Sequence, residues 1–286
     1  MSDDDRLFKK YWPADLQIVG KDIIRFHGIY WPIFLMALDL PLPKKIYAHG
    51  FIMMKDGKMS KSKGNVVYPD MLVEKYGLDA TRYFLLREFS FGQDAVFSPE
   101  GFIERYNFDL CNDLGNLLNR TIGMINKYFD GVIPTNLAQK TEFDDVLEKF
   151  TSEKIHEVEE CMDSYHISNA LENIWSVIAR TNKYIDETAP WVLAKNEEKD
   201  KLASVMYHLS ENLRKIAIMI LPVMSNTGND ILRQLGINEE ELKGWESIKD
   251  GAKIKEGTKV IEKGEPLFMR LDMDVETAYI KEQMNS

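Results

Sequence analysis

Three lysines and two serines alternate in the short stretch GKMSKSKGN, residues 57–65. A lysine side chain is a mobile point charge, and several of them can neutralise the negative charge that develops on pyrophosphate as it leaves ATP. A solvated surface turn of the same composition is the alternative interpretation. The elements beside this stretch help to decide between the two.

The residues before the lysine stretch predict a strand, a helix and a second strand. Residues 16–19 are a short apolar run and residues 44–50 are a second predicted strand, and residues 21–38 between them have the length of a helix that Pro32 would kink or interrupt. A right-handed β-α-β unit of this kind belongs to an open parallel sheet, which binds ligands beyond the carboxyl ends of its strands. The residues at those ends are Gly20, Lys21, Asp22, His49 and Gly50.

The lysine stretch is predicted to continue from a hairpin beside this edge. The pair Asp56-Gly57 is a strong tight-turn signal between two segments of strand character. Downstream, Pro69 and Gly77 bound a short predicted helix, and Asp79 is expected to cap the start of the next one. The lysines therefore follow a predicted ligand edge, which favours the phosphate clamp.

The remainder of the chain predicts a helical bundle. A stretch rich in Gly, Pro and Ser, residues 90–101, separates it from the first part. Apolar residues then recur at spacings of three and four in segments joined by short polar connections, as in an antiparallel bundle. These segments are 102–129, 142–163, 166–188, 197–222 and 224–235, and residues from 239 onward are expected to be rich in turns. The predicted fold class is thus α/β plus all-α.

Composition excludes several classes of protein. Of the 286 residues, 44% are hydrophobic, and the longest apolar run, residues 29–38, is shorter than the roughly 18 residues of a membrane span. The acidic first residues do not form a secretory signal, so we expect a cytoplasmic protein with no membrane partner. The two cysteines lack C-x-x-C spacing, so we expect neither a disulfide framework nor a cysteine zinc site.

The charge distribution bears on polyanion binding. The chain has a net charge of -10, yet residues 1–65 contain 11 basic and 7 acidic residues, which is a local excess of four positive charges. A site for a polyanion should therefore be local and shaped, because a broad basic face is not available.

The sequence KMSKS at residues 58–62, followed by KGN, matches the signature of class I aminoacyl-tRNA synthetases. Residues 15–51, 58–88 and 182–195 resemble methionyl-tRNA synthetases, and the similarity extends over nearly the whole chain. The resemblance implies a Rossmann-like catalytic fold followed by an anticodon-binding bundle. It implies ATP with Mg²⁺, L-methionine and tRNA(Met) as substrates and partners.

The resemblance assigns roles to the signature loop. Lys61 would contact the ATP phosphates, and four further residues would complete the loop: Lys58, Met59, Ser60 and Ser62. These residues would act on the pyrophosphate as it leaves ATP.

Four residues near the predicted strand ends also receive roles by resemblance. Gly20 and Asp22 would face the ATP ribose, and His49 would lie near the adenine. His27 would line the methionine pocket. Judged by residue type alone, Asp22 is also a good helix N-cap and His27 a common kind of core residue, so these alternatives stay open.

In the helical half, the resemblance points to anticodon recognition by Asn116, Arg120 and Trp191. Asn116 and Arg120 are four residues apart on a predicted helix and are therefore neighbours, although a solvated polar face would look the same. Trp191 follows Pro190 at a helix exit, where a tryptophan is either a core residue or a platform for an unstacked base.

The chain also departs from the family pattern. It contains no HIGH-type histidine element and no cysteine-ligated zinc knuckle. We therefore expect a C-terminal fragment of the family that is inactive alone in forming methionyl-adenylate, with zinc, if any, confined to the absent N-terminal part. The expected organisation is a partial Rossmann domain at 1–54, the signature loop and connecting helices at 55–98, an anticodon-binding domain at 99–238 and an extension at 239–286.

Two other functions are compatible with parts of this pattern. A noncatalytic RNA-binding module would need the bundle but no ordered signature loop. A class I synthetase of different amino-acid specificity would share the signature, although the segment YIDETAPW argues against it. A dehydrogenase or P-loop enzyme is disfavoured, because neither G-x-G-x-x-G nor G-x-x-x-x-G-K occurs.

Overall fold

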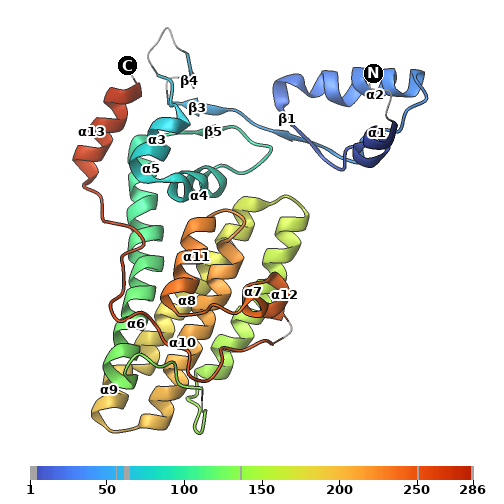
Figure 1. Ribbon diagram of the computed structural model, residues 1–286. Helices are drawn as coiled ribbons and strands as arrows, with labels where there is room; N and C mark the ends of the chain where they lie inside the picture. Colours follow the sequence, from blue (N-terminus) through green and yellow to red (C-terminus); the bar gives the residue numbers. More distant parts are fainter. Residues whose placement is uncertain (1–4, 56, 61–64, 136, 250, 285–286) are drawn as a thin grey trace.

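The structure is a computed structural model that describes residues 5–55, 57–60, 65–135, 137–249 and 251–284. The chain is mostly helical and has two small sheets. The amino-terminal elements lie at one end of the molecule, and the helices of the larger part stand side by side beyond them (Figure 1). Within the described residues, no helix has both the length and the apolar character needed to cross a membrane.

The predicted strand-helix-strand unit is confirmed. After α1 (Asp5–Tyr11), β1 (Gln17–Gly20) pairs in parallel with β2 (Ile46–His49), and Gly20 lies opposite His49. Three helical segments connect the two strands: the 3₁₀ turn η1 (Lys21–Ile23), the π-helical η2 (Phe26–Tyr30) and α2 (Trp31–Ala37).

The effect of Pro32 appears as a change of helix type and not as a break. This proline occupies the first turn of α2, directly after the π-helical segment. Tyr30 and Trp31 keep helical dihedral angles, so the helical backbone continues from η2 into α2. Because proline has no backbone N–H, one hydrogen bond of the helical ladder is missing here.

The hairpin that leads into the lysine stretch is confirmed. In the second sheet the strand order is β4-β3-β5. The strands are β3 (Ile52–Met54), β4 (Gly57–Lys58) and β5 (Ala95–Val96). Met54 lies opposite Gly57 in the antiparallel pair, which leaves a two-residue connection. Gly57 has φ 112°, a conformation that glycine adopts without strain, whereas Asp56 lies outside the described residues.

Two short helices follow the lysine stretch, as predicted. They are α3 (Pro69–Tyr76) and α4 (Leu78–Glu88), and Gly77 joins them with φ 88°. The expectation that Asp79 caps α4 is wrong, because Asp79 lies inside the first turn of that helix. Its Oδ2 instead accepts hydrogen bonds from the Thr227 backbone N–H at 2.6 Å and the Thr227 hydroxyl at 2.8 Å.

All five predicted helical segments of the bundle are present. The first contains α5 (Pro99–Arg105), the π-helical η4 (Tyr106–Gly115) and α6 (Asn116–Phe129). The other four contain α7 (Asp144–Asp163), α8 (Ile167–Thr188), α10 (Lys199–Ile220) and α11 (Ser225–Gln234). A short helix that was not predicted, α9 (Pro190–Lys195), lies between the third and fourth segments. Thr227 thus stands in the first turn of α11, so that Asp79 caps a helix distant in sequence. The bundle holds most of the buried apolar side chains, with α10 buried along nearly its whole length.

The prediction for the last part of the chain is wrong for its final segment. Two short elements, η5 (Glu240–Leu242) and α12 (Trp245–Lys249), precede a stretch of turns, but α13 (Met273–Met284) is a helix. It returns to the other end of the molecule and packs beside α5 (Figure 1). Lys281 forms an ion pair with Glu100 at 2.5 Å, and the Glu276 carboxylate accepts a hydrogen bond from the Tyr76 hydroxyl at 2.8 Å.

Candidate nucleotide and RNA sites

Three predicted site residues meet at the carboxyl ends of β1 and β2. Gly20 lies opposite His49 in the parallel pair, and Asp22 follows in the 3₁₀ turn η1. A Cβ atom at Gly20 would lie 2.6 Å from Asp22 Oδ1 and 3.9 Å from His49 Cε1, so both side chains approach this glycine. Gly20, not Asp22, occupies the N-cap position, which rules out the cap interpretation of Asp22.

His49 and Gly50 lie beside a loop from residues 90–94. The His49 ring stands edge-on to Phe91, with 6.5 Å between centroids. A Cβ atom at Gly50 would lie 2.0 Å from the Gln93 carbonyl oxygen, so only glycine allows the two backbones to come this close. An apolar cavity of about 240 Å³ is lined partly by these residues and Phe89.

Two lysines converge on one aromatic ring near this edge. The ammonium groups of Lys21 and Lys58 both lie 4.7 Å from the centroid of the Phe51 ring. The Asp94 carboxylate accepts two hydrogen bonds, one from the Lys21 ammonium group at 2.5 Å and one from the Phe51 backbone N–H at 2.8 Å. The hydrogen bond from Lys21, supported by that from Phe51, lowers the pKa of the Asp94 carboxyl. The site therefore combines one carboxylate with two cations that share the Phe51 ring.

Lys21 was not selected as a site residue by sequence reasoning. The signal that could have identified it is its place between Gly20 and Asp22 at the end of β1. A lysine at that position can reach the Phe51 ring, which Lys58 of the β3–β4 hairpin also approaches.

The signature loop is described in its first half. Lys58 ends β4, Met59 packs against the apolar core, and the Ser60 backbone N–H donates to Asn65 Oδ1 at 2.8 Å. The remaining predicted residues of the loop, Lys61 and Ser62, lie outside the described residues.

His27 lies away from the core. Its Nδ1 atom is 3.1 Å from the Ile23 carbonyl oxygen, and the half-buried ring borders a cavity of about 400 Å³. The other lining residues are Gln17, Phe26, Tyr30, Trp31 and Phe34. The side-chain oxygen of Gln17 is buried and has no hydrogen-bond partner among the described residues. The lining of the cavity is thus largely aromatic and includes a histidine.

The three predicted anticodon-reading residues are exposed on neighbouring helices. Asn116 and Arg120 lie on the outer face of α6. Arg120 Nη2 donates to Asp186 Oδ1 at 3.3 Å, which links α6 to the last turn of α8, five residues before Trp191. The Trp191 side chain is 49% exposed, so the interpretation of this residue as core is wrong.

A strained residue sets the position of Trp191. Ala189 joins α8 to α9 with φ 41° and ψ 65°, the left-handed conformation that residues other than glycine rarely adopt. Pro190 then begins α9 at the position where proline is favoured. The chain therefore turns sharply after α8, and Trp191 stands at the start of a new helix on the surface.

Asp113 is an unusual carboxylate on the same long helical segment. It lies in η4, and burial, together with the nearby Asp109 carboxylate, raises its pKa to about 6. Its backbone carbonyl accepts a hydrogen bond from Asn182 at 3.1 Å. The pKa of the Asp113 carboxyl is higher in the folded protein than its ordinary value of 3.8, so the folded chain holds this proton more tightly than the unfolded chain does. The stability of the fold therefore falls as the pH rises from 3.8 through about 6.

Replacing Asp113 with asparagine should therefore stabilise the chain at pH 7.5 by about 1–2 kcal/mol, a value reduced to allow for partial solvent exposure. The difference should shrink toward zero at pH 4, where the wild-type carboxyl is protonated. Urea denaturation at both pH values measures it, with Asp163→Asn at an exposed position as the control. A destabilised Asp113→Asn at pH 7.5 would show that the charged form is favoured instead.

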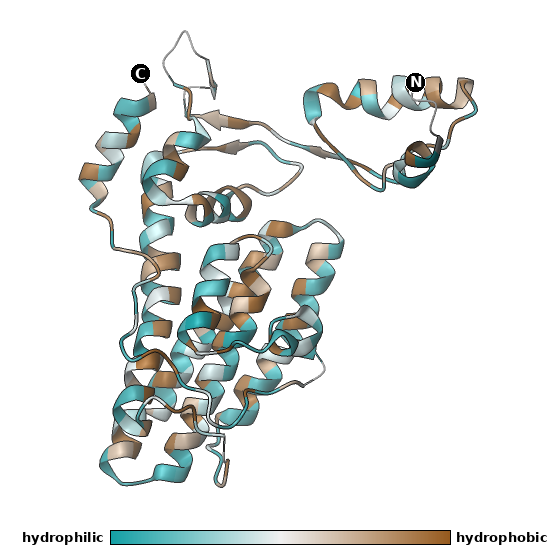
Figure 2. Cartoon of the chain, viewed as in Figure 1, coloured by the Kyte–Doolittle hydropathy of each residue, from teal (hydrophilic) through white to brown (hydrophobic). Residues whose placement is uncertain are grey.

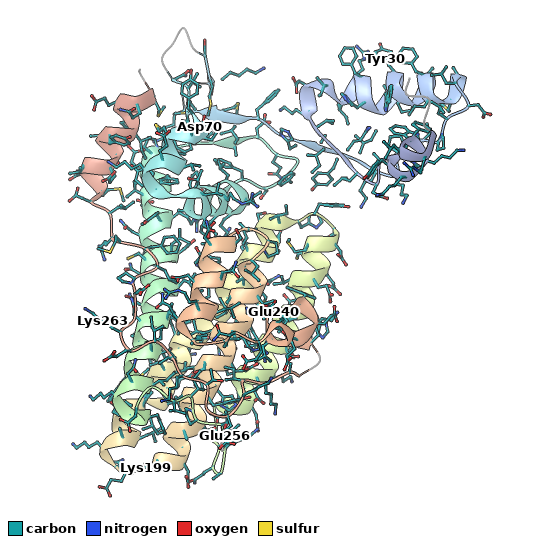
Figure 3. The ribbon with its side chains drawn as sticks, viewed as in Figure 1. Tyr30, Asp70, Lys199, Glu240, Glu256 and Lys263 are labelled. Atoms are coloured by element: carbon teal, nitrogen blue, oxygen red, sulfur yellow. The ribbon has the colours of Figure 1, made fainter. Side chains whose placement is uncertain are left out.

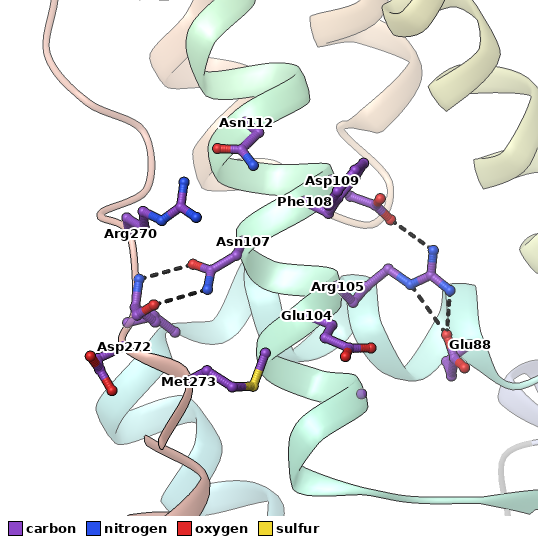
Figure 4. Close-up of a pocket in the computed structure, with 12 residues that line it drawn as sticks. Glu88, Glu104, Arg105, Asn107, Phe108, Asp109, Asn112, Arg270, Asp272 and Met273 are labelled. Atoms are coloured by element: carbon purple, nitrogen blue, oxygen red, sulfur yellow. Dashed lines mark hydrogen bonds and ion pairs between the residues drawn. The ribbon is translucent and has the colours of Figure 1, made fainter. Parts of the chain in front are cut away.

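A larger cavity, about 790 Å³, lies between η4 and residues 270–273 (Figure 4). Asn107 holds this segment by two hydrogen bonds to the Leu271 backbone, both 2.9 Å long. Arg105 bridges Glu88 at 2.6 Å and Asp109 at 3.1 Å on the other wall. None of the predicted site residues within the described part of the chain lines this cavity.

Sequence comparison matches two family models. Residues 1–122 match "tRNA synthetases class I (M)", and residues 133–284 match "Anticodon binding domain of methionyl tRNA ligase". A methionine–tRNA ligase of Listeria monocytogenes is 60% identical over 284 residues, which is 99% of this chain and 43% of that protein. One from Bacillus subtilis is 58% identical over 284 residues, with 99% and 42% coverage. The chain thus spans about two fifths of the length of these curated relatives.

Solved structures of methionyl-tRNA synthetases also match this chain. A Mycobacterium tuberculosis methionyl-tRNA synthetase in complex with methionyl-adenylate matches with a TM-score of 0.87 and 39% identity. The match covers 93% of this chain and 52% of that one. The apo form from the same organism matches with a TM-score of 0.85 and 36% identity over 95% of this chain.

Proposed function

Because the chain belongs to the methionyl-tRNA synthetase family, we propose that it provides the ATP-side loop and the anticodon-reading surface of a ligase that joins L-methionine to tRNA(Met). The observation that carries this proposal is the half-exposed Trp191, which lies within residues 133–284, the part of the chain that matches the family's anticodon-binding model. A tryptophan exposed at a helix start offers a flat face on which an unstacked base can lie.

The proposed chemistry is that of a methionine–tRNA ligase, and the groups at the sheet edge are given roles in it. The methionine carboxylate attacks the α-phosphate of ATP, which is bound with Mg²⁺ as substrate, and pyrophosphate leaves. Lys21 and Lys58 carry the positive charge closest to this edge, and Asp22 is placed to accept a ribose hydroxyl. The methionyl group then passes from the adenylate to the 3′ ribose of the tRNA. Lys61, Met59, Ser60 and Ser62 complete the loop in this proposal.

The methionine and adenine contacts are proposed from their surroundings. The cavity beside His27 is lined mainly by aromatic side chains, which suits a thioether side chain. His49 is exposed at the end of β2, where its ring packs edge-on against Phe91, and we propose that it contacts the adenine there. Within the described part of the chain, no group of three or more His, Cys, Asp or Glu side chains is arranged to hold a metal ion.

The finer architecture is also a proposal. The parallel pair β1–β2 is the carboxyl-terminal part of a Rossmann-like sheet in residues 1–54, and residues 55–98 connect it to the anticodon-binding bundle at 99–238. Residues 239–286 form an extension, and the packing of α13 against α5 supports a tie between the two ends of the molecule.

Binding to RNA hairpins tests the proposed function. The chain should bind a hairpin with the methionine anticodon CAU at least about tenfold more tightly than the same stem with a changed loop, because base contacts specify and phosphate contacts do not. Both affinities must be measured at one salt concentration, since phosphate contacts make binding salt-dependent. Equal affinity for both loops would contradict anticodon reading and leave only nonspecific RNA binding.

A further inference from the structure

Residues 259–265 form a short segment that is fastened along α6. We call it the return segment, because it belongs to the part of the chain that runs from α12 back to α13. One glutamine holds both of its sides. The Ile261 backbone N–H donates to the Gln234 carbonyl oxygen at 2.9 Å, and the Gln234 side chain makes two hydrogen bonds of 3.0 Å with the Glu265 backbone. Gln234 is fully buried, so residues 262–264 form a loop between two fixed points.

The return segment also contacts α6 directly. The Asn126 side-chain amide donates to the Ile261 carbonyl oxygen at 2.9 Å. A Cβ atom at Gly264 would lie 3.0 Å from Asn119 Oδ1 and 3.9 Å from the Asn119 Cα atom, so the missing side chain lets the loop come this close to the helix. The loop is therefore held against the turn of α6 that contains Asn119 and Arg120.

The exposed face of α6 runs beside this loop. Asn116 and Arg120, the proposed anticodon readers, are exposed at a spacing of four, and Gly123 and Lys127 continue the same stripe. Figure 2 shows hydrophilic and hydrophobic bands alternating along α6, as expected for a helix with one face in solvent. A Cβ atom at Gly123 would meet open space within the described part of the chain. The stripe is thus accessible to a ligand.

Lys263 lies in the loop of the return segment. It is exposed, and it projects on the side of α6 away from the other bundle helices (Figure 3). With the residues that the structure describes, it makes neither a hydrogen bond nor an ion pair, whereas Arg120 is already engaged by Asp186 at 3.3 Å. Because the ends of the loop are already fixed, a ligand that binds Lys263 has little backbone to order.

The ligand that suits this cation is the sugar-phosphate backbone of RNA. Amide and guanidinium groups can hydrogen-bond the edges of bases, whereas an ammonium group on a flexible stem is a point charge for a phosphate. The chain as a whole has a net charge of -10 and repels RNA at long range. A phosphate contact therefore has to come from single cations placed beside the residues that read the bases.

We propose that Lys263 binds a backbone phosphate of the RNA next to the anticodon, and that it contributes to affinity without reading sequence. The inference rests on the proposed function, which makes RNA the ligand. It extends the RNA surface from the bundle helices to residues 259–265, which belong to the turn-rich extension. Glu262 is also exposed in the same loop and carries the opposite charge, so it should oppose the phosphate that Lys263 attracts.

Binding of the full chain to the two RNA hairpins tests this inference. Lys263→Gln should weaken binding to the CAU hairpin and to the changed-loop hairpin by the same factor, about 3- to 10-fold at about 0.1 M salt. The plot of log affinity against log salt concentration should become shallower by about one unit, because one counterion fewer is released. Glu262→Gln should act in the opposite direction and strengthen binding to both hairpins about twofold.

Two further variants serve as controls. Lys149→Gln on α7 removes the same charge from a side chain that is 79% exposed, and it should change both affinities less than about 1.5-fold. Lys263→Arg keeps the charge and should bind both hairpins as the wild type does. Circular dichroism can confirm that all four variants fold.

Three results would overturn the inference. They are an unchanged affinity and salt slope in Lys263→Gln, a loss confined to the CAU hairpin, and an equal loss in Lys149→Gln. The proposed function fails by a different result, equal affinity of the wild-type chain for the two hairpins. Even then, a loss of affinity for both hairpins in Lys263→Gln, with the shallower salt slope, would support the phosphate contact.

Discussion

Trp191→Ala should lower the affinity of the chain for the CAU hairpin about 10- to 100-fold and bring it close to the affinity for the changed loop. Stacking of a base on an aromatic side chain contributes about 1–3 kcal/mol, and alanine removes the whole platform. The indole is 49% exposed, so its removal takes little packing from the core, and the midpoint of unfolding should stay near that of the wild type. Titration of both hairpins at fixed salt measures the effect.

The adjacent Val192→Ala is the matched control for this prediction. Val192 is 42% exposed on the same short helix but has no flat ring, and its replacement should change the affinity less than about twofold. An unchanged preference for CAU in Trp191→Ala would show that Asn116 and Arg120 read the loop without a stacking platform. Loss of binding to both hairpins would instead indicate a general RNA contact.

Arg214→Met should destabilise the chain by about 3–5 kcal/mol, the largest effect on folding that we expect from one substitution. Arg214 on α10 is fully buried. It donates to Glu211 at 2.5 Å and to the carbonyl oxygens of Leu242 and Ala252, both at 2.8 Å. Methionine fills a similar volume but leaves the Glu211 carboxylate and both carbonyls without this donor.

The partner residue provides the control. The double variant Arg214→Met with Glu211→Met removes the buried charge as well as its partner, so it should recover a large part of the lost stability. Urea denaturation of the single and double variants measures the coupling between the two residues. If the single variant loses less than about 1 kcal/mol, the cluster does not hold α10 to residues 242–252.

Most elements were predictable because their signals are local. The strand-helix-strand unit, the hairpin at Gly57 and the five bundle segments each show the expected apolar spacing or turn residues within a short window. Gly77 likewise ends α3 as its residue type predicts. The candidate residues Gly20, Asp22 and His49 meet because a parallel register follows from the β-α-β unit.

The features that were missed depend on contacts between distant parts of the chain. Asp79 has the residue type of a helix cap, but Thr227, 148 positions away, competes successfully for its carboxylate. The α13 helix has only two buried residues, Ile280 and Met284, so its apolar spacing is too weak to show in the sequence. The approach of Lys21 to the Phe51 ring likewise exists only in three dimensions.

If RNA binds at Trp191 as proposed, the left-handed Ala189 has a consequence for the kinetics of that binding. Holding alanine in this conformation costs about 1–2 kcal/mol, and the turn it makes fixes the direction of α9 before any ligand is present. A glycine at this position would relieve the strain but let the short helix sample other directions. With alanine, an arriving loop meets Trp191 already in place. Hairpins that differ in the anticodon should therefore associate at similar rates and be distinguished by how long they remain bound.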